Sequence, residues 1–334
     1  MTHRLAPLTR LTRLSRRRLL AAALTAVVLP ASAQTAAGFP SKPIKILVPF
    51  NAGSGADSSS RYYGEALGKL LGQQVVVENR PGGSGVVAVQ AVRQLPADGH
   101  TILMGSNSPA VVNAITVKDL PYDPFKHLRP LYGVAISPVA FAVRADSPYK
   151  TVADLVAAAR SSKKPLQLGN YSAGYQLVAA WLGSSTSLPV DHIPYKGGAQ
   201  MLTDVVGGQL DVGVIDFTGT TELMKGGRLR VLAITAAQRD PKYPDIPTMK
   251  ESGYPEFETG VWSAFFMRTE TPDDIVDKLA AALHKAMTSD AGRAYQATLP
   301  STALLMGPKE LGEFQLREYQ RFKRVAEAAG IKPE

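Results

Sequence analysis

The chain of 334 residues contains no cysteine. A protein of this size needs neither disulfide bonds to stabilise its core nor an oxidising compartment to form them. Without cysteine, a lipid anchor after the N-terminal apolar stretch is also excluded. That stretch covers residues 19–29, only 11 residues. A membrane-spanning helix needs about 20, so a transmembrane anchor is disfavoured as well.

The N-terminal segment has the pattern of a signal peptide. Six arginines and no acidic residue precede the apolar stretch, and Pro30 is followed by Ala31-Ser32-Ala33, whose small side chains suit a signal peptidase. We therefore expect residues 1–33 to be removed after Ala33 and the protein to be periplasmic. Export by the Sec route is expected, and Ser15-Arg16-Arg17-Arg18 also fits the twin-arginine route.

Little net charge remains outside this segment. It holds six of the 37 basic residues and none of the 28 acidic ones, which leaves 31 basic against 28 acidic side chains, a net charge of +3. A nucleic-acid-binding protein needs a clustered basic stripe with interleaved aromatic residues, and none is found. We therefore expect neither a nucleic acid nor a membrane surface as partner. The remaining 301 residues favour about two domains.

Short β-branched runs alternate with helical stretches, a pattern typical of parallel βαβ units. The expected strands are residues 44–50, 74–78, 101–105, 139–145, 166–170, 190–193, 212–217 and 230–235. We predict an α/β protein with two lobes, each a mostly parallel sheet flanked by helices. Segments 139–145 and 257–267 are candidates for crossing between the lobes. The predicted lobes are residues 34–140 with 264–334, and residues 141–263.

The last expected helix covers residues 313–329. It places Leu316, Tyr319, Phe322 and Val325 on one stripe. Such an apolar stripe usually covers a sheet, so we predict that it packs against the core.

Signatures of catalysis are scarce. The five histidines are scattered, and none pairs with another at metal-ligand spacing. Residues 82–85 fail the nucleophile-elbow pattern because Val86 stands where glycine is needed. Residues 53–58 lack the third glycine of a dinucleotide fingerprint. We therefore expect no catalytic residue, no metal and no cofactor, and a protein that is not an enzyme.

Three strand-to-helix junctions are rich in glycine and small hydroxyl residues. They cover residues 51–57, 170–175 and 195–199. Backbone N–H groups at a helix start favour an anion, and glycine lets a ligand approach the backbone. Each junction alone also reads as an ordinary βα turn. Three junctions at the carboxyl ends of strands favour a binding site for a small carboxylate, because ligands of open α/β sheets gather there.

The chain resembles the solute receptors of tripartite tricarboxylate transporters, the Bug family. The matching segments include Val48-Pro49-Phe50, Val77-Glu78-Asn79-Arg80-Pro81-Gly82, Leu120-Pro121-Tyr122-Asp123-Pro124 and Ile193-Pro194-Tyr195-Lys196-Gly197-Gly198. The match runs over nearly the whole chain after the signal segment. It implies a type II periplasmic-binding-protein fold that closes on a carboxylate held mainly by backbone amides and ordered water.

The resemblance also assigns ligand contacts by position. The expected first-lobe contacts are Phe50, Asn51, Ala52, Gly53, Asp57, Ser106 and Asn107. The expected second-lobe contacts are Tyr171, Ser172, Ala173, Gly174, Tyr175, Lys196, Gly197, Gly198, Ala199, Asp216 and Phe217. Asp57 reads equally as a helix N-cap. Asp216 reads either as a selector of a ligand amine or hydroxyl or as a partner of buried N–H groups. Tyr175 departs from the family pattern and either stacks on an aromatic acid or narrows the site.

The expected function is therefore that of a solute-binding receptor. Its ligand would be an aliphatic or aromatic mono- or dicarboxylate, delivered to membrane permease subunits. A ligand-sensing subunit for a membrane kinase is the alternative, and an exported hydrolase comes third because no plausible set of nucleophile, base and acid is present. We expect a monomer, since the lobes must open and close.

Overall fold

The computed structural model describes residues 38–162, 164–299 and 301–333. The segment predicted as a signal peptide lies outside the described residues, so its cleavage and the export route stay predictions. No helix in the described ranges is both long and apolar enough to cross a bilayer.

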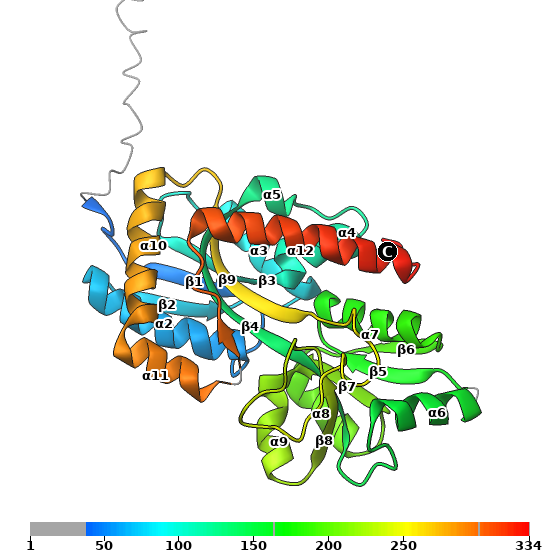
Figure 1. Ribbon diagram of the computed structural model, residues 1–334. Helices are drawn as coiled ribbons and strands as arrows, with labels where there is room; N and C mark the ends of the chain where they lie inside the picture. The colour runs from blue at the N-terminus through cyan, green and yellow to red at the C-terminus, as the bar shows by residue number, and fades with distance from the viewer. Residues whose placement is uncertain (1–37, 163, 300, 334) are drawn as a thin grey trace, which may run out of the picture. The chain divides into compact units, whose positions relative to one another are not determined.

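The strands of the described residues form a mixed sheet in the order β2-β1-β3-β9-β4-β7-β5-β6 (Figure 1). They are β1 (Ile44–Val48), β2 (Val75–Asn79), β3 (Thr101–Ser106), β4 (Leu128–Arg144), β5 (Leu166–Asn170), β6 (Val190–Pro194), β7 (Val212–Asp216) and β9 (Gly260–Arg268). Two further strands, β8 (Leu229–Ile234) and β10 (Thr302–Ala303), pair with β4.

The long strand β4 joins the two halves of this sheet, one half in each lobe. From Leu128 to Pro138 it pairs with β9, and from Val139 to Arg144 it pairs with β7 and β8. The α/β prediction with two lobes is confirmed. The group β2-β1-β3 is parallel and pairs with β9 in antiparallel fashion, and the parallel group β7-β5-β6 pairs with β4 in antiparallel fashion, so both parts of the sheet are mixed. We propose that the lobes meet at residues 138/139 and 259/260, a few residues from the boundaries expected from sequence.

Helices cover both faces of the sheets. On the first lobe they are α2 (Gly55–Leu71), η2 (Gly83–Gly85), α3 (Val86–Gln94), η3 (Ser108–Val112), α4 (Asn113–Thr116), α5 (Pro124–His127), α10 (Asp273–Thr288), α11 (Asp290–Thr298) and α12 (Pro308–Ala328). On the second lobe they are α6 (Val152–Ser162), α7 (Ala173–Thr186), α8 (Gly198–Val206), η4 (Phe217–Thr220) and α9 (Thr221–Lys225).

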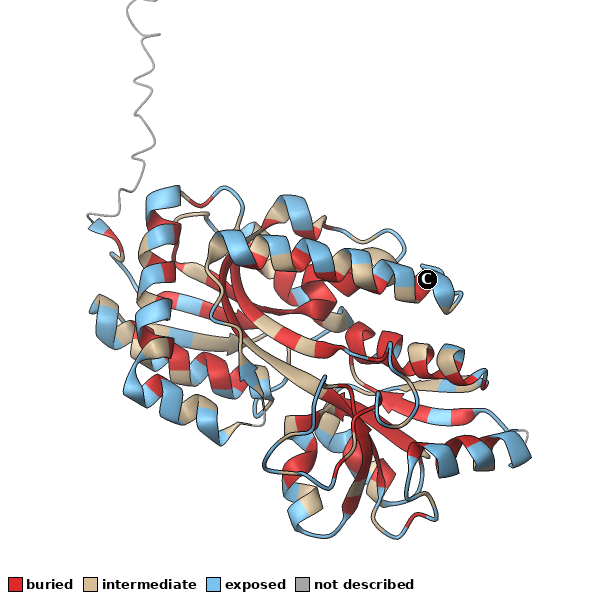
Figure 2. Ribbon diagram, in the orientation of Figure 1, coloured by how far each residue is buried: buried red, intermediate tan, exposed pale blue. Residues whose placement is uncertain are grey.

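Strand β1 packs apolar side chains on both of its faces, which fixes where its carboxyl end lies. Ile44, Ile46 and Val48 pack on one face with residues of α2 and α10, and Leu47 packs on the other with residues of α3. Successive side chains of a strand point to opposite faces, so one apolar run fills two cores. Figure 2 shows the buried residues gathered on the strands and on the inward faces of the helices. The strand therefore delivers the following loop, residues 49–54, to the edge of the sheet.

Helix α7 belongs to the second lobe but also contacts the core of the first. Leu177 and Ala173 pack in the same buried cluster as Trp262 of β9 and Leu47 of β1. Tyr175 and Val178 pack instead with the second-lobe strands. The first turn of α7 is therefore held by both lobes.

Helix α12 begins five residues before the predicted start, at Pro308, and its buried face differs from the predicted stripe. Phe322 is buried as expected, but Leu316 is 49% exposed. The buried positions are Leu311, Gln315, Glu318, Phe322 and Ala326. Gln315 is buried because its side-chain amide donates to the carbonyl of Ala110 in η3. The inward face of α12 was predicted wrongly at Leu316 because polar residues with partners took its place.

Candidate functional site

A cavity of about 220 Å³ lies where the two sheets meet, and we call it the inner cavity. Its walls come from both lobes: Phe50, Ser54, Gly55, Ala56, Ser58, Ser59, Ser106, Ala135, Ser137, Tyr171, Ser172, Tyr175, Asp216, Thr218, Val261, Trp262, Ser263, Tyr295, Leu299 and Ser301. An outer pocket of about 510 Å³ shares Phe50, Tyr171 and Ser172 with it and reaches Asn51 and Lys196. Phe50 and the Tyr171-Ser172 corner therefore stand between the two spaces.

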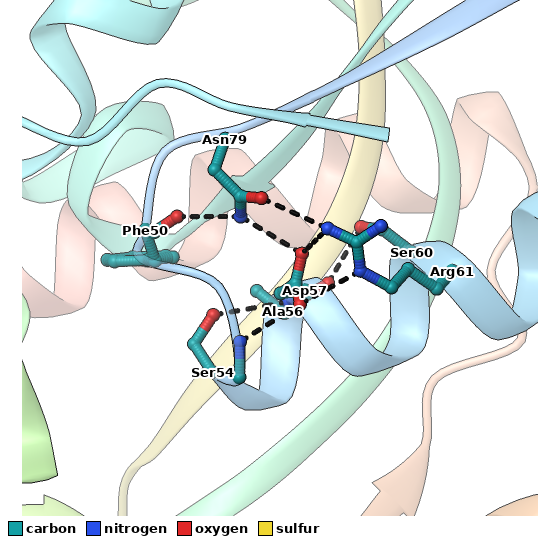
Figure 3. Close-up of polar contacts among 8 residues, drawn as sticks. Phe50, Ser54, Ala56, Asp57, Ser60, Arg61 and Asn79 are labelled. Atoms are coloured by element: carbon teal, nitrogen blue, oxygen red, sulfur yellow. Dashed lines mark hydrogen bonds and ion pairs between the residues drawn. The ribbon is translucent and has the colours of Figure 1, made fainter. Parts of the chain in front are cut away.

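The corner between β1 and α2 is held by Asp57 (Figure 3). The side chain of Ser54 accepts the N–H of Asp57, and the Asp57 carboxylate accepts the N–H of Gly53. The same carboxylate accepts from Arg61 and from the Asn79 amide, which also donates to the carbonyl of Phe50. Gly53 has φ +84°, a left-handed conformation that favours glycine.

These contacts settle the position of Asp57. The N-cap of α2 is Ser54, three residues earlier, and Asp57 is not among the residues lining either space. Its carboxylate is buried and bonded to protein donors. Burial raises the pKa of Asp57, but the hydrogen bonds from Arg61, Gly53 and Asn79 outweigh burial and hold its pKa below the ordinary value. Asp57 orders the loop that carries Gly53 and Phe50 instead of facing the inner cavity.

The first turn of α2 supplies hydrogen-bond donors to the inner cavity. Gly55 and Ala56 line it, and no acceptor in the described part of the chain takes their N–H groups. The N-terminus of a helix carries a partial positive charge, which favours an anion there. Ser106, at the end of β3, adds a buried hydroxyl without a partner among the described residues. This wall of the cavity is suited to a carboxylate.

The corner before α7 differs from the expectation. The N–H of Ala173 donates to Ser84 Oγ, and the N–H of Gly174 donates to Ser108 Oγ, at 3.1 Å each. Both serines belong to the first lobe, so hydroxyl groups of the protein occupy the donors that sequence reasoning assigned to a ligand. The expectation that the N–H groups are free for a ligand is wrong for Ala173 and Gly174, although Ser172 and Tyr175 do line the inner cavity.

Replacing Ser108 with alanine is expected to lower the free energy of unfolding by about 1–3 kcal/mol. Ser108 is fully buried, and its loss leaves the N–H of Gly174 buried without an acceptor. Urea unfolding of Ser108→Ala checks the change. Ser161→Ala, an exposed position on α6, is the control and should differ little from the wild type. Equal stability of the two variants would show that the hydrogen bond from Gly174 to Ser108 does not contribute to the free energy of unfolding.

The third corner, before α8, faces the outer pocket rather than the inner cavity. Lys196 lines this pocket, and its carbonyl accepts from the Asn51 amide across the lobes at 3.4 Å. A Cβ on Gly198 would lie 2.8 Å from Ile215 Cδ1 and 3.2 Å from the Tyr171 ring, so glycine favours the close packing of this corner. Gly197 and Ala199 line neither space. Of the three amide-rich corners, the ones before α2 and α7 line the inner cavity. In the described ranges, the N–H groups of Gly55 and Ala56 have no acceptor, whereas those of Ala173 and Gly174 are taken by serine hydroxyls.

Asp216, at the end of β7, is the centre of a second polar cluster. Its Oδ1 accepts from the hydroxyls of Tyr171 at 2.8 Å and Tyr175 at 3.0 Å, and its Oδ2 accepts the N–H of Gly219. Burial, together with the Asp216 charge, raises the pKa of both tyrosines well above the ordinary value. The two hydroxyls therefore keep their protons, and they donate them within the cluster: Tyr175 to Asp216, and Tyr171 to Asp216 or to the Tyr175 oxygen.

The remaining predicted contacts lie beside the site. Phe217 is fully buried in a second-lobe cluster and stacks edge-on with Tyr243, so its side chain is part of the core. Asn107 is buried against the first turn of α7, and neither atom of its amide has a hydrogen-bond partner among the described residues. Ala52 is exposed and lines neither space. The predicted residues that line the inner cavity are Phe50, Ser106, Tyr171, Ser172, Tyr175 and Asp216.

Among the predicted contacts are none of the wall residues Ser54, Gly55, Ala56, Ser58, Ser59 and Thr218, although these adjoin predicted positions. Sequence reasoning also missed two groups of wall residues far from any predicted contact. One lies on the strands that cross between the lobes, β4 and β9, and includes Ser137, Trp262 and Ser263. Segment 257–267 was predicted to cross, so Trp262 and Ser263 could have been proposed, whereas Ser137 lies in the part of β4 before the predicted segment 139–145. The other group, Tyr295, Leu299 and Ser301, follows from the placement of α11, for which the sequence carries no signal. Within the described ranges, no group of histidine and acidic side chains is arranged to hold a metal ion.

The lobes and the cleft between them define a solute-binding protein of the periplasmic type. Its fold matches the periplasmic binding protein BugD with a TM-score of 0.82 at 28% identity, over 89% of this chain and 100% of that one. A family model described as the tripartite tricarboxylate transporter family receptor matches residues 60–331. The chain belongs to this family. Both the family and the fold point to a periplasmic binding protein rather than to an enzyme.

Individual relatives agree with this assignment. A UPF0065 protein of Bordetella bronchiseptica is 33% identical over 96% of this chain and 95% of its own length. BugT of Bordetella pertussis is 30% identical over 93% and 95%. An R. palustris structure with adipate has a TM-score of 0.84 at 29% identity, over 89% and 100%. MatC from Rhodopseudomonas palustris with bound malate has a TM-score of 0.81 at 26% identity, over 86% and 99%.

Proposed function

We propose that the protein is an exported periplasmic receptor that captures a small carboxylate in the inner cavity and delivers it to membrane permease subunits of a tripartite tricarboxylate transporter. It works as a monomer, and its two lobes close around the ligand. The single observation that supports a carboxylate ligand is the first turn of α2, where Gly55 and Ala56 line the cavity and their N–H groups have no acceptor among the described residues. Membership of the receptor family supports delivery to a permease.

The walls support binding without a cationic side chain. Of the described residues that line the inner cavity, eight are serines, and none is lysine, arginine or histidine. Each hydrogen bond to a charged ligand contributes roughly 1.5–3 kcal/mol, and a helix N-terminus adds about 0.3–1 kcal/mol. Two backbone donors and a few hydroxyls are therefore enough for micromolar binding after the cost of association. The cavity is smaller than the roughly 300–1,000 Å³ typical of drug-sized ligands, which favours a small acid.

Calorimetric titration tests this function with variants of Gly55. Gly55 is the first residue of α2, where proline is well tolerated, and Ser54 before it is extended, as a residue before proline must be. Gly55→Pro therefore removes one N–H while keeping the helix start. Because Gly55 lines the cavity and its N–H has no acceptor among the described residues, we expect affinity for carboxylates to fall at least about tenfold.

Gly55→Ala is the matched control. It keeps the N–H, and the added Cβ meets no atom within 4 Å. We expect the alanine variant to bind nearly as well as the wild type. Equal affinities of the proline and alanine variants would show that the N–H of residue 55 does not bind the ligand. No heat with any aliphatic or aromatic acid would contradict the receptor function itself.

A further inference from the structure

The inner cavity has two chemically different ends. One end is the first turn of α2, which offers the N–H groups of Gly55 and Ala56. Ser106 adds a hydroxyl, 4% exposed as a residue, whose oxygen has no partner among the described residues. These groups donate hydrogen bonds, so this end suits an anion.

The other end is formed by Asp216, Tyr171 and Tyr175 and offers the opposite chemistry. Each tyrosine hydroxyl has one proton, and each lies within 3.0 Å of Asp216 Oδ1. The two hydroxyl oxygens lie 3.1 Å apart. Tyr175 donates its proton to Asp216, and Tyr171 donates its proton to Asp216 or to the Tyr175 oxygen. With both protons used inside this cluster, the tyrosine oxygens offer lone pairs rather than protons to a ligand. Asp216 has three donors within hydrogen-bond distance, the two tyrosines and Gly219, which is the environment of an ionised carboxylate.

No cation compensates for this charge inside the cavity. Among the described wall residues Asp216 is the only charged one, and Lys196 lines only the outer pocket. An anionic group placed near Asp216 would therefore meet a like charge in a poorly screened space, which disfavours it. A hydroxyl or ammonium group there would donate to a carboxylate or a tyrosine oxygen, and hydrogen bonds to ionised groups are the stronger kind.

We propose that the inner cavity selects a monocarboxylate that carries a hydroxyl or amino group away from its carboxylate, and that it discriminates against dicarboxylates. The carboxylate binds at the first turn of α2, and the hydroxyl or amino group faces Asp216, Tyr171 and Tyr175. This selectivity rests on the proposed function, because it assumes that the cavity is the ligand site. It separates this chain from the neighbours solved with adipate and with malate, both of which carry two carboxylates.

Titration of the wild-type protein with acids matched in chain length tests the selectivity directly. The probes are adipate against 6-hydroxyhexanoate and 6-aminohexanoate, and succinate against 4-hydroxybutanoate and 4-aminobutanoate. We expect a hydroxy or amino acid to bind at least tenfold more tightly than its matched dicarboxylate. A dicarboxylate that binds equally or more tightly overturns the selectivity and leaves the receptor function standing. Silence with every probe overturns the receptor function, and the selectivity with it.

A variant assigns the selectivity to Asp216. Asp216→Asn removes the negative charge at nearly constant size, so the ratio between hydroxy acid and dicarboxylate affinities should fall at least tenfold. The matched control is Asp146→Asn, an exposed second-lobe position paired with Arg144, which should leave the ratio unchanged. An unchanged affinity ratio in Asp216→Asn would show that Asp216 does not determine the selectivity. The titration of the wild-type protein needs no variant, so it tests the selectivity even if Asp216→Asn does not fold.

Discussion

Replacing Trp262 with alanine is expected to lower the free energy of unfolding by about 3–5 kcal/mol. Trp262 is fully buried on β9, where the two lobes meet, and its ring packs edge-on against Phe314 at 5.3 Å. Its neighbours come from β1, α3, α7 and α12, which are held by both sheets and cannot all move into the space. Most of the cavity left by the indole should therefore remain, and its cost adds to the lost burial.

Urea unfolding followed by circular dichroism measures this loss. Trp262→Phe keeps an aromatic ring in the cluster and should cost less than the alanine variant. Leu316→Ala on α12 is the control, because Leu316 is 49% exposed, and it should change stability by less than about 0.5 kcal/mol. A Trp262→Ala protein as stable as Leu316→Ala would show that the junction between the lobes repacks freely. Since Trp262 also lines the inner cavity, a weaker ligand affinity should accompany the loss.

The strands that were predicted correctly are those that a continuous run of apolar residues marks in the sequence. Ile44, Ile46 and Val48 in β1 are apolar because the strand is covered on both sides, so the pattern predicts both the strand and its burial. The first part of β4 was missed for a physical reason. It contains Pro130, Gly133 and Pro138, residues that argue against a regular strand. The structure accommodates them with irregular pairing to β9 between residues 130 and 135.

The site was predictable where one chain segment builds it and not where distant segments meet. The loop after β1 was located by its glycines, and the α2 corner does offer donors to the cavity. The corner before α7 looks the same in sequence. Its donors are taken by Ser84 and Ser108, which lie 89 and 66 residues from their partners. No local sequence pattern predicts hydrogen bonds between such distant residues. Two glycine-rich turns can therefore look the same in sequence although only one of them has its N–H groups bonded to the protein.

Replacing Asp57 with asparagine is expected to lower the free energy of unfolding at pH 7 by about 2 kcal/mol. The side chain is buried and accepts from Arg61, Asn79 and the N–H of Gly53, and asparagine keeps the shape without the charge. Arg61 is half exposed and regains water when its partner is lost, so the cost stays below that of breaking a fully buried ion pair. The loop that carries Gly53 and Phe50 to the cavity should loosen as well.

The effect of this substitution should depend on pH in a defined direction. Burial opposes the charge of Asp57, but its donors outweigh burial and hold its pKa below that of an aspartate in the unfolded chain, about 3.9. A lowered pKa stabilises the folded state above the unfolded value, and this contribution is lost as the pH falls through the folded pKa. The stability gap between wild type and Asp57→Asn should therefore be full at pH 7 and shrink below about pH 4. Urea unfolding at a series of pH values measures the gap, with Asp146→Asn as an exposed control. A gap that stays constant down to pH 3 would show that Asp57 contributes through its shape and not through its charge.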